Sequence, residues 1–264
     1  MVITSKDNQY IHLVNELKKK KYRDKYGMFI AEGKRLIEDL CGSDLMPHLI
    51  LYAEDFTDIA FLEKVCHKAD HVFAVSRKLF DKISETCNDQ GIIAVFPVLC
   101  PELRCFTPDE NGLIFILNGV SDPGNLGTIV RSSAAANVSA ILMEEGCVDL
   151  YNPKVIRSTM GTVAKIPIFH GLEHSEIRSF LERHQIETFL ADMNEAITYD
   201  ELPETERIAV VLGNEGNGIS DPWRKGFYRG VMIPMENEVE SLNVAMAAGI
   251  IAFDHHRKVR KNLK

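Results

Sequence analysis

In the stretch Asp122-Pro-Gly-Asn-Leu-Gly-Thr-Ile-Val-Arg131, a turn-forming sequence passes into a helical one soon after an apolar run. Two other blocks also follow apolar runs: Leu212-Gly-Asn-Glu-Gly-Asn-Gly218, and Ile233-Pro-Met235 together with Glu240-Ser-Leu-Asn-Val244. Each block places Gly, Asn or Pro where a predicted strand ends. Open α/β sheets build their ligand crevices at such ends. The three blocks therefore predict an α/β fold with a ligand site made of loops.

The apolar runs around these blocks predict buried strands that alternate with helices. Helical stretches are expected near residues 126–136, 175–184 and 241–258, and Ser241 is the expected N-cap of the last one. Strands that alternate with helices form a mostly parallel sheet. The predicted strands of this half are Leu113–Leu117, Ala140–Met143, Thr188–Ala191, Ile208–Leu212 and Gly230–Ile233.

The first hundred residues also predict short helices and strands. Apolar residues recur at helical spacing in residues 8–20 and 33–40. Prolines at 97, 101 and 108 then interrupt any periodic element. The predicted organisation is a domain of residues 1–98, a linker of residues 99–110 and a domain of residues 111–264. The candidate strands of the first domain are His48–Tyr52, Val72–Val75 and Ile92–Phe96.

The charge of the chain argues against indiscriminate binding of nucleic acid. Its formal net charge is −8, whereas contacts to phosphate need Lys or Arg. Cations nevertheless gather in two runs, Lys18–Lys25 and His255–Lys264, so a basic surface on an acidic body is possible. The alternative for these runs is a solvated helix face and a frayed tail.

Composition sets further limits on the class of protein. The chain has 264 residues and 45% hydrophobic content, as expected of a globular protein. It has no apolar run of about 18 residues, and its start does not resemble a signal peptide, so a cytoplasmic protein without a membrane partner is expected. The six cysteines form no CxxC pair, so neither a zinc site nor a disulfide framework is expected.

Polar side chains in the blocks are the candidates for chemistry. Arg131 shares a helix face with Gly127 and Thr128, whose small side chains leave it room to point back towards the cleft. An exposed helix arginine is the alternative reading. Glu215 would repel phosphate, so a nucleoside or a cationic ligand fits that loop better. Asn243, just beyond the expected cap, could orient a ligand.

In order and spacing, the three blocks resemble the three signature motifs of the SpoU/TrmH family of RNA ribose methyltransferases, within the SPOUT superfamily of S-adenosylmethionine enzymes. The resemblance covers roughly residues 111–260, including the segment 151–167 between the first two motifs. The N-terminal part, with Met28-Phe-Ile-Ala-Glu-Gly33, is similar to the substrate-binding domain that many members carry. That domain has a small α/β fold related to certain ribosomal RNA-binding proteins.

The resemblance implies a deep trefoil knot in the C-terminal domain, which pattern reasoning would not propose because true knots are rare. It also implies a homodimer whose active sites draw on both subunits. S-adenosylmethionine is the implied cofactor, and no metal is implied. By motif position, the cofactor-binding residues would be Leu212, Gly213, Gly216, Ile233, Met235 and Leu242.

The implied reaction transfers a methyl group to a ribose 2′-hydroxyl, which is a poor nucleophile until its proton is drawn away. The family assigns this activation to the arginine of the first motif, here Arg131. A guanidinium stays protonated in proteins, so Arg131 is expected to act with a substrate phosphate and to stabilise developing alkoxide charge. Asn125, Ser241 and Asn243 would orient the ribose or support Arg131. Glu215 would do the same, and it is also the alternative base.

Several alternatives stay open at this level. The chain could be an RNA-binding homologue without activity, a base methyltransferase, or a generic nucleotide-binding enzyme, although no phosphate-binding motif is present. An N-terminal substrate domain favours ribosomal RNA over transfer RNA by analogy. A housekeeping role and an antibiotic-resistance role are not distinguished.

Overall fold

The computed structural model of this chain describes residues 2–43, 45–86, 89–193, 196–214, 216–226, 228–237 and 240–262. It divides into two compact units. The first comprises Met1–Leu99 and Asp149–Lys165, and the second comprises Cys100–Val148 and Ile166–Lys264. The chain thus returns once to the first unit, at Asp149–Lys165. The predicted boundaries placed these residues in the second domain, residues 111–264.

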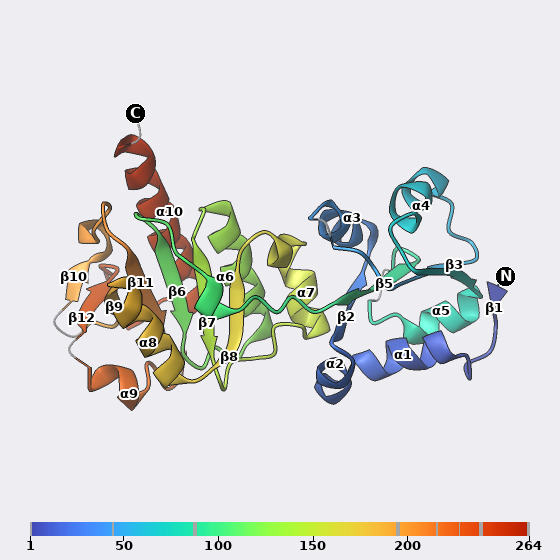
Figure 1. Ribbon diagram of the computed structural model, residues 1–264, viewed down its shortest axis with the longest axis horizontal. Helices are drawn as coiled ribbons and strands as arrows, with labels where there is room; N and C mark the ends of the chain where they lie inside the picture. The colour runs from blue at the N-terminus through green and yellow to red at the C-terminus, as the bar shows by residue number, and fades with distance from the viewer. Residues whose placement is uncertain are drawn as a thin grey trace. The chain divides into compact units, whose positions relative to one another are not determined.

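The first unit is a sheet with helices on both faces (Figure 1). Its strands are β1 (Val2–Ile3), β2 (Met28–Glu32), β3 (Leu49–Ala53), β4 (His71–Val75) and β5 (Ile92–Pro97). Its first five helices are α1 (Gln9–Leu17), α2 (Lys20–Tyr26), α3 (Lys34–Gly42), α4 (Ile59–Cys66) and α5 (Arg77–Ile83).

The strands of this sheet follow the order β1-β4-β3-β5-β2, and β5 runs antiparallel to both of its neighbours. Because successive side chains of a strand point to opposite faces, alternate residues such as Leu49 and Leu51 of β3 reach one face. There they join apolar side chains of α1 and α5 in a buried cluster. The three strands predicted for this half are confirmed as β3, β4 and β5, within one residue at each end.

Residues 149–165 bring helix α7 (Pro153–Thr159) and the short turn Thr162–Ala164 to the first unit. The ring of Tyr151 packs on that of Phe29 at 4.9 Å, and its hydroxyl bonds both the amide and the carbonyl of Leu99. Arg23, within the predicted basic run, is buried and forms an ion pair with Asp149. The interpretation of residues 18–25 as a purely solvated cationic face is therefore wrong at Arg23.

The second unit is a seven-stranded sheet in which all pairs of neighbouring strands are parallel. Its strands are β6 (Leu113–Leu117), β7 (Ala140–Glu144), β8 (Ile168–Leu172), β9 (Glu187–Ala191), β10 (Ala196–Thr198), β11 (Ile208–Leu212) and β12 (Arg229–Met232). Its helices are α6 (Pro123–Ala135), α8 (His174–His184), α9 (Asp221–Arg224) and α10 (Val244–Asn262), with short turns at Leu103–Cys105 and Tyr199–Glu201.

Helices α6 and α10 pack together on one face of this sheet, and α8 covers the other (Figure 1). The prediction of an α/β fold with a mostly parallel sheet is confirmed. The five predicted strands are all present, while β8 and β10 were not predicted. No helix within the described residues is long and apolar enough to cross a membrane.

The strand order β10-β12-β9-β11-β6-β7-β8 determines where a ligand site can form. From β6 the chain passes through α6 to β7 on one side, whereas from β11 it passes through α9 to β12 on the other. Neighbouring strands β6 and β11 therefore form a switch point, and such sheets bind ligands outside the carboxyl ends of strands at that point. The first block begins there after β6 and the second after β11, while the third follows β12, which β9 separates from β11.

Candidate cofactor cavity and catalytic groups

The first block opens helix α6 as predicted, but the helix begins at Pro123, three residues before the expected start near residue 126, so the predicted turn is its N-cap and first turn. Asp122 is the N-cap, and its carboxylate accepts from the amide of Asn125 at 2.8 Å. Pro123 occupies the first helical position, where a missing N–H costs nothing. Asn125 thus lies in the first turn of the helix, and its side chain is half-buried.

The second block forms a tight loop after β11. The backbones of Asn214 and Gly218 pair with each other at 3.0 and 2.8 Å. A Cβ atom on Gly213 would lie 2.6 Å from the backbone of Gly218, so only glycine fits at Gly213. The Asn214 side chain donates to the carbonyl of Gly119 at 2.7 Å and accepts from the amide of Gly216 at 2.8 Å. Glu215, a predicted catalytic residue, lies outside the described residues.

The third block begins helix α10 later than predicted, and the N-cap is Asn243 rather than Ser241. The Oδ1 atom of Asn243 accepts from the amides of Ala245 at 3.0 Å and Met246 at 3.2 Å. Asparagine and serine are about equally good caps, and the buried apolar residues of the helix begin at Val244. The oxygen of the Asn243 amide group is therefore used to cap the helix.

The other side of that amide group joins the first and third blocks. The Nδ2 atom of Asn243 donates to Oδ1 of Asn125 at 3.0 Å. Two predicted catalytic residues that are far apart in the sequence are thus in direct contact, at the starts of α6 and α10.

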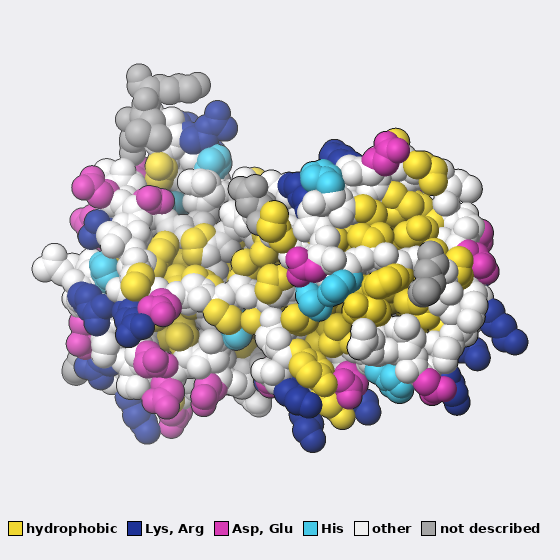
Figure 2. Space-filling model, turned by 45° about the vertical axis from the view of Figure 1, so that its right-hand side comes forward, with side chains coloured by type: hydrophobic (Ala, Val, Ile, Leu, Met, Phe, Trp, Pro, Cys, Tyr) yellow, Lys and Arg dark blue, Asp and Glu magenta, His cyan; other side chains and the backbone are white. Residues whose placement is uncertain are grey.

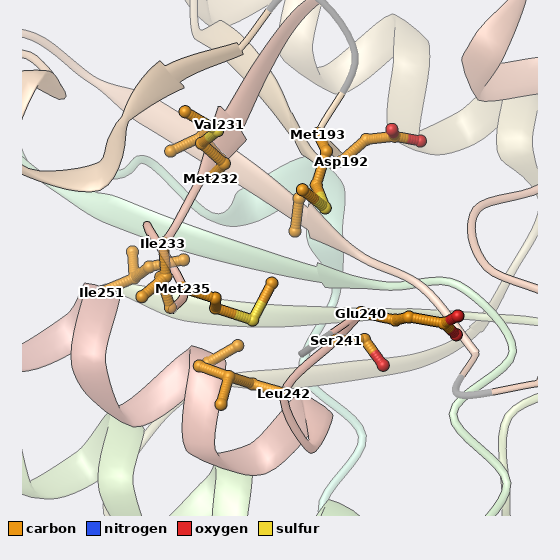
Figure 3. A pocket seen from close by; sticks show the side chains of 12 residues that line it. Asp192, Met193, Val231, Met232, Ile233, Met235, Glu240, Ser241, Leu242 and Ile251 are labelled. Carbon is orange, nitrogen blue, oxygen red and sulfur yellow. The ribbon is translucent and has the colours of Figure 1, made fainter. Parts of the chain in front are cut away.

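Two adjoining cavities lie at the carboxyl ends of β9, β11 and β12. The larger, of about 430 Å³, contains Leu212, Gly213, Ser241, Leu242 and Asn243 in its wall. The smaller, of about 140 Å³, contains Ile233 and Met235, and shares Ser241 and Leu242 with the larger. Figure 3 shows the side chains of Met193, Met235 and Leu242 pointing towards the same space.

Five of the six predicted cofactor-binding residues line these cavities: Leu212, Gly213, Ile233, Met235 and Leu242. Gly216 does not line either cavity, and its amide donates within the loop to the side chain of Asn214. Asp192 and Arg224, which were not predicted from the sequence, also line the larger cavity and form an ion pair at 2.8 Å. The position of Asp192 directly after β9 was the signal that could have found it.

Arg131 lies outside the cavity walls. Its side chain is exposed on α6, and no acceptor among the described residues bonds it. Within one chain, the structure brings Ser241 and Asn243 to the cavity and bonds Asn125 of α6 to Asn243, but it leaves Arg131 of α6 exposed.

Comparisons with known proteins assign the chain to a family. Residues 112–253 match the SpoU rRNA Methylase family, and residues 8–94 match the MRM3-like substrate binding domain. The chain belongs to the SpoU rRNA methylase family.

Relatives of this SpoU-family chain resemble it along almost its whole length. The 23S rRNA (guanosine(2553)-2′-O)-methyltransferase RlmP of Bacillus subtilis is 29% identical over 95% of this chain and 97% of its own. The mitochondrial rRNA methyltransferase 3A of Danio rerio is 28% identical over 96% of this chain and 69% of its own. The crystal structure of AdoMet-bound rRNA methyltransferase from Sinorhizobium meliloti matches with a TM-score of 0.88, 26% identity and 97% coverage of each chain.

These findings confirm the prediction of an RNA 2′-O-ribose methyltransferase that uses S-adenosylmethionine. The cavities fit that cofactor because apolar and sulfur-containing side chains line them together with backbone of a glycine-rich loop. Among their described lining residues, Arg224 is the one fixed cation, and Asp192 pairs with it. A nucleoside carrying a positive charge suits this wall better than a triphosphate. The roles of individual residues stay predictions.

Proposed function

We propose that this SpoU-family enzyme methylates the ribose 2′-hydroxyl of one nucleotide in large-subunit ribosomal RNA. The single observation that carries the proposal is the contact between Asn125 and Asn243 beside the cavity. It joins the motif expected to face the ribose to the motif expected to hold the cofactor. The name of the Bacillus subtilis relative, a 23S rRNA methyltransferase, supports the choice of RNA.

In this proposal the cavity residues hold the cofactor. S-adenosylmethionine supplies an electrophilic methyl group on a sulfonium. Leu212, Ile233, Met235 and Leu242 offer apolar surface to it, and the Gly213 backbone can approach it closely because no side chain intervenes. Gly216 contributes by closing the turn that shapes this wall.

Arg131 positions the ribose in this proposal and does not remove its proton. A guanidinium keeps its proton in proteins, so Arg131 would bind a substrate phosphate and stabilise the alkoxide charge as it develops. The proton then leaves through that phosphate or through water. Asn125, Ser241 and Asn243 orient the ribose or support Arg131. Glu215 is the alternative base.

The proposal includes a homodimer formed through α10. Met246 and Phe253 are 60% and 51% exposed, and with Ile250 they repeat at intervals of four and three residues along one helix face. An apolar stripe of this kind on a helix is typical of a face that packs on another helix. Because α6 packs beside α10, a partner on this stripe would approach Arg131, which a single chain leaves exposed.

The first unit would bind the RNA through a surface that we call the α2 patch. The rings of Tyr22 and Tyr26 stack at 6.2 Å, with Lys21 over the first ring and Lys25 over the second. Lysines bind phosphate, and aromatic rings at a surface stack on bases; both rings here are half-buried. On the face of this unit that Figure 2 shows, Lys, Arg, Asp, Glu and His side chains lie around a broad hydrophobic area. The α2 patch consists of Lys19, Lys20, Lys21, Tyr22, Lys25 and Tyr26.

Three further features belong to the proposal. They are the trefoil knot, a functional division into an RNA-binding domain at residues 1–98 and a methyltransferase domain at residues 111–264, and a cytoplasmic location. The family matches at residues 8–94 and 112–253 support the division. The bacterial relative supports the location, although vertebrate relatives are named as mitochondrial.

Mapping of 2′-O-methyl groups in total RNA from cells with and without the gene tests the proposed function. Loss of one methyl group from large-subunit rRNA is expected, and purified protein with S-adenosylmethionine should restore it in vitro. Loss of a methyl group from transfer RNA alone would contradict the choice of substrate. An unchanged map, with no transfer in vitro, would contradict the activity.

A further inference from the structure

Glu144 is a buried carboxylate at the carboxyl end of β7, behind the cavity walls. It is 7% exposed, and its two oxygens accept from three N–H groups on three different elements. The donors are Nδ2 of Asn118 after β6, Nδ1 of His174 at 3.1 Å on α8, and Nε1 of Trp223 at 2.8 Å on α9. A buried carboxylate costs much free energy unless its acceptors are used, and these three bonds use both oxygens.

Asn118 extends this network to the loop that follows β11. While its Nδ2 donates to Glu144, its Oδ1 accepts from the amide of Ser220 at 2.7 Å. Trp223, fully buried, lies three residues after Ser220 and is held by the same carboxylate. One buried group therefore fixes the end of the loop at two points.

The loop held in this way forms part of the cofactor cavity. Gly213, Asn214, Gly218 and Ile219 all line the larger cavity. Asn214 anchors the start of the loop to the carbonyl of Gly119, while Asn118 and Glu144 anchor its end. Gly119 and Asn118 belong to the segment directly after β6, and Glu144 ends the next strand, β7, so all three lie on the other side of the switch point from the loop.

We propose that Glu144 and Asn118 are a positioning pair that sets the shape of the cofactor-binding wall. The inference rests on the proposed cofactor site. The orientation of the Asn118 amide is fixed, because turning it over would set an N–H₂ group against the Ser220 amide and an oxygen against the Glu144 carboxylate. All of these hydrogen bonds can therefore form only when one side chain of the pair is an amide and the other is a carboxylate, which only accepts.

The proposal can be tested by moving the amide to position 144 and the carboxylate to position 118, first one at a time and then together. In Glu144→Gln, the N–H₂ group of the new glutamine faces either the N–H₂ group of Asn118 or the N–H groups of His174 and Trp223, whichever way the amide is turned. In Asn118→Asp, the new carboxylate faces the carboxylate of Glu144. In the double variant Asn118→Asp with Glu144→Gln, every hydrogen bond can form again, because the glutamine donates to the aspartate and the aspartate still accepts from Ser220. Each single variant is expected to raise the Kd for S-adenosylmethionine about tenfold or more, and the double variant to return it to within about threefold.

The measurements are isothermal titration of the full-length protein with S-adenosylmethionine and the Tm of each variant. Phe180→Leu, in the α8 core, is the matched control, because it should lower the Tm without changing the Kd. Should a single variant fail to fold, recovery of both folding and affinity in the double variant supports the pair. Single variants that bind as tightly as the unaltered protein, or a double variant that folds but binds weakly, overturn the inference. Failure of the unaltered protein to bind would instead count against the proposed cofactor site.

Discussion

Asn243 donates to Asn125 at 3.0 Å while its own oxygen caps helix α10. One amide group thus serves both the stability of a helix and the junction of two sequence motifs. Because a carboxylate can cap a helix but cannot donate, the two roles can be separated by substitution.

Asn243→Asp should keep the cap and lose the bond to Asn125. We expect the free energy of unfolding to change little, and kcat to fall by about tenfold or more as the junction opens. Asn243→Ala should lose both roles and about 1 kcal/mol of stability. Urea unfolding and methyl transfer measured on both variants check this. Full activity in Asn243→Asp would show that the junction does not matter for catalysis.

Arg131→Ala and Arg131→Lys should each lower kcat at saturating RNA by about a hundredfold or more, since lysine does not reproduce the planar fork of donors. Glu215→Gln should retain most activity and the same pH profile if the proton leaves through phosphate or water. Loss of activity in Glu215→Gln, with Arg131→Lys still active, would make Glu215 the base.

Substitution of the apolar stripe on α10 should separate the subunits. Met246→Glu and Phe253→Glu each place a charge in the proposed interface, so we expect monomers in light scattering and loss of methyl transfer. Ile59→Glu is the matched control, because Ile59 is 56% exposed on α4 in the first unit. A monomeric unaltered protein would refute the proposed dimer.

Stability should fall in mild acid because of His255. Burial lowers the pKa of His255 to about 4, whereas in the unfolded chain it lies near 6.5. Below pH 6.5 the unfolded chain therefore binds a proton that the folded chain does not, and stability falls as the pH drops towards 4. The loss is at most about 3 kcal/mol. Urea unfolding at pH 7.5, 6 and 5 measures it, and His255→Leu should flatten the slope.

Neutralising the α2 patch should weaken RNA binding. Lys21→Ala with Lys25→Ala should raise the Kd for rRNA and lower the slope of log K against log salt by about 1 for each phosphate that is no longer bound. The pair Lys78→Ala with Lys82→Ala removes the same charge from exposed positions on α5 and should have little effect. Equal effects of the two pairs would mean that the patch has no special role.

The sequence predicted those features in which local pattern and tertiary structure agree. The apolar runs predicted the central strands, and the block from Asp122 predicted a turn that opens a helix, although α6 begins three residues earlier than expected. Strand β8 was missed because His170 and Gly171 are exposed at its outer edge and break the apolar pattern. The cap of α10 was misplaced because Ser241 and Asn243 are both good caps, and only packing at Val244 chooses between them.

Features that depend on contacts between distant segments could not be predicted. Arg23 reads as one more cation in a basic run, and its burial depends on Asp149. Glu144 ends an apolar strand, but nothing local shows that Asn118, His174 and Trp223 meet there. Arg131 was a candidate from its position in the first block, but its role came from the resemblance, since within one chain its side chain is exposed and lines no described cavity.

The return of residues 149–165 to the first unit means that the two units are not interchangeable modules. The chain crosses from one to the other at residues 99–100, 148–149 and 165–166, so a protease that cuts once near residue 100 would leave them joined. A fragment ending at residue 99 would also lack Asp149. The buried guanidinium of Arg23 would then have lost its counter-ion. Insertion or exchange of the N-terminal part by gene fusion must therefore carry the second segment with it.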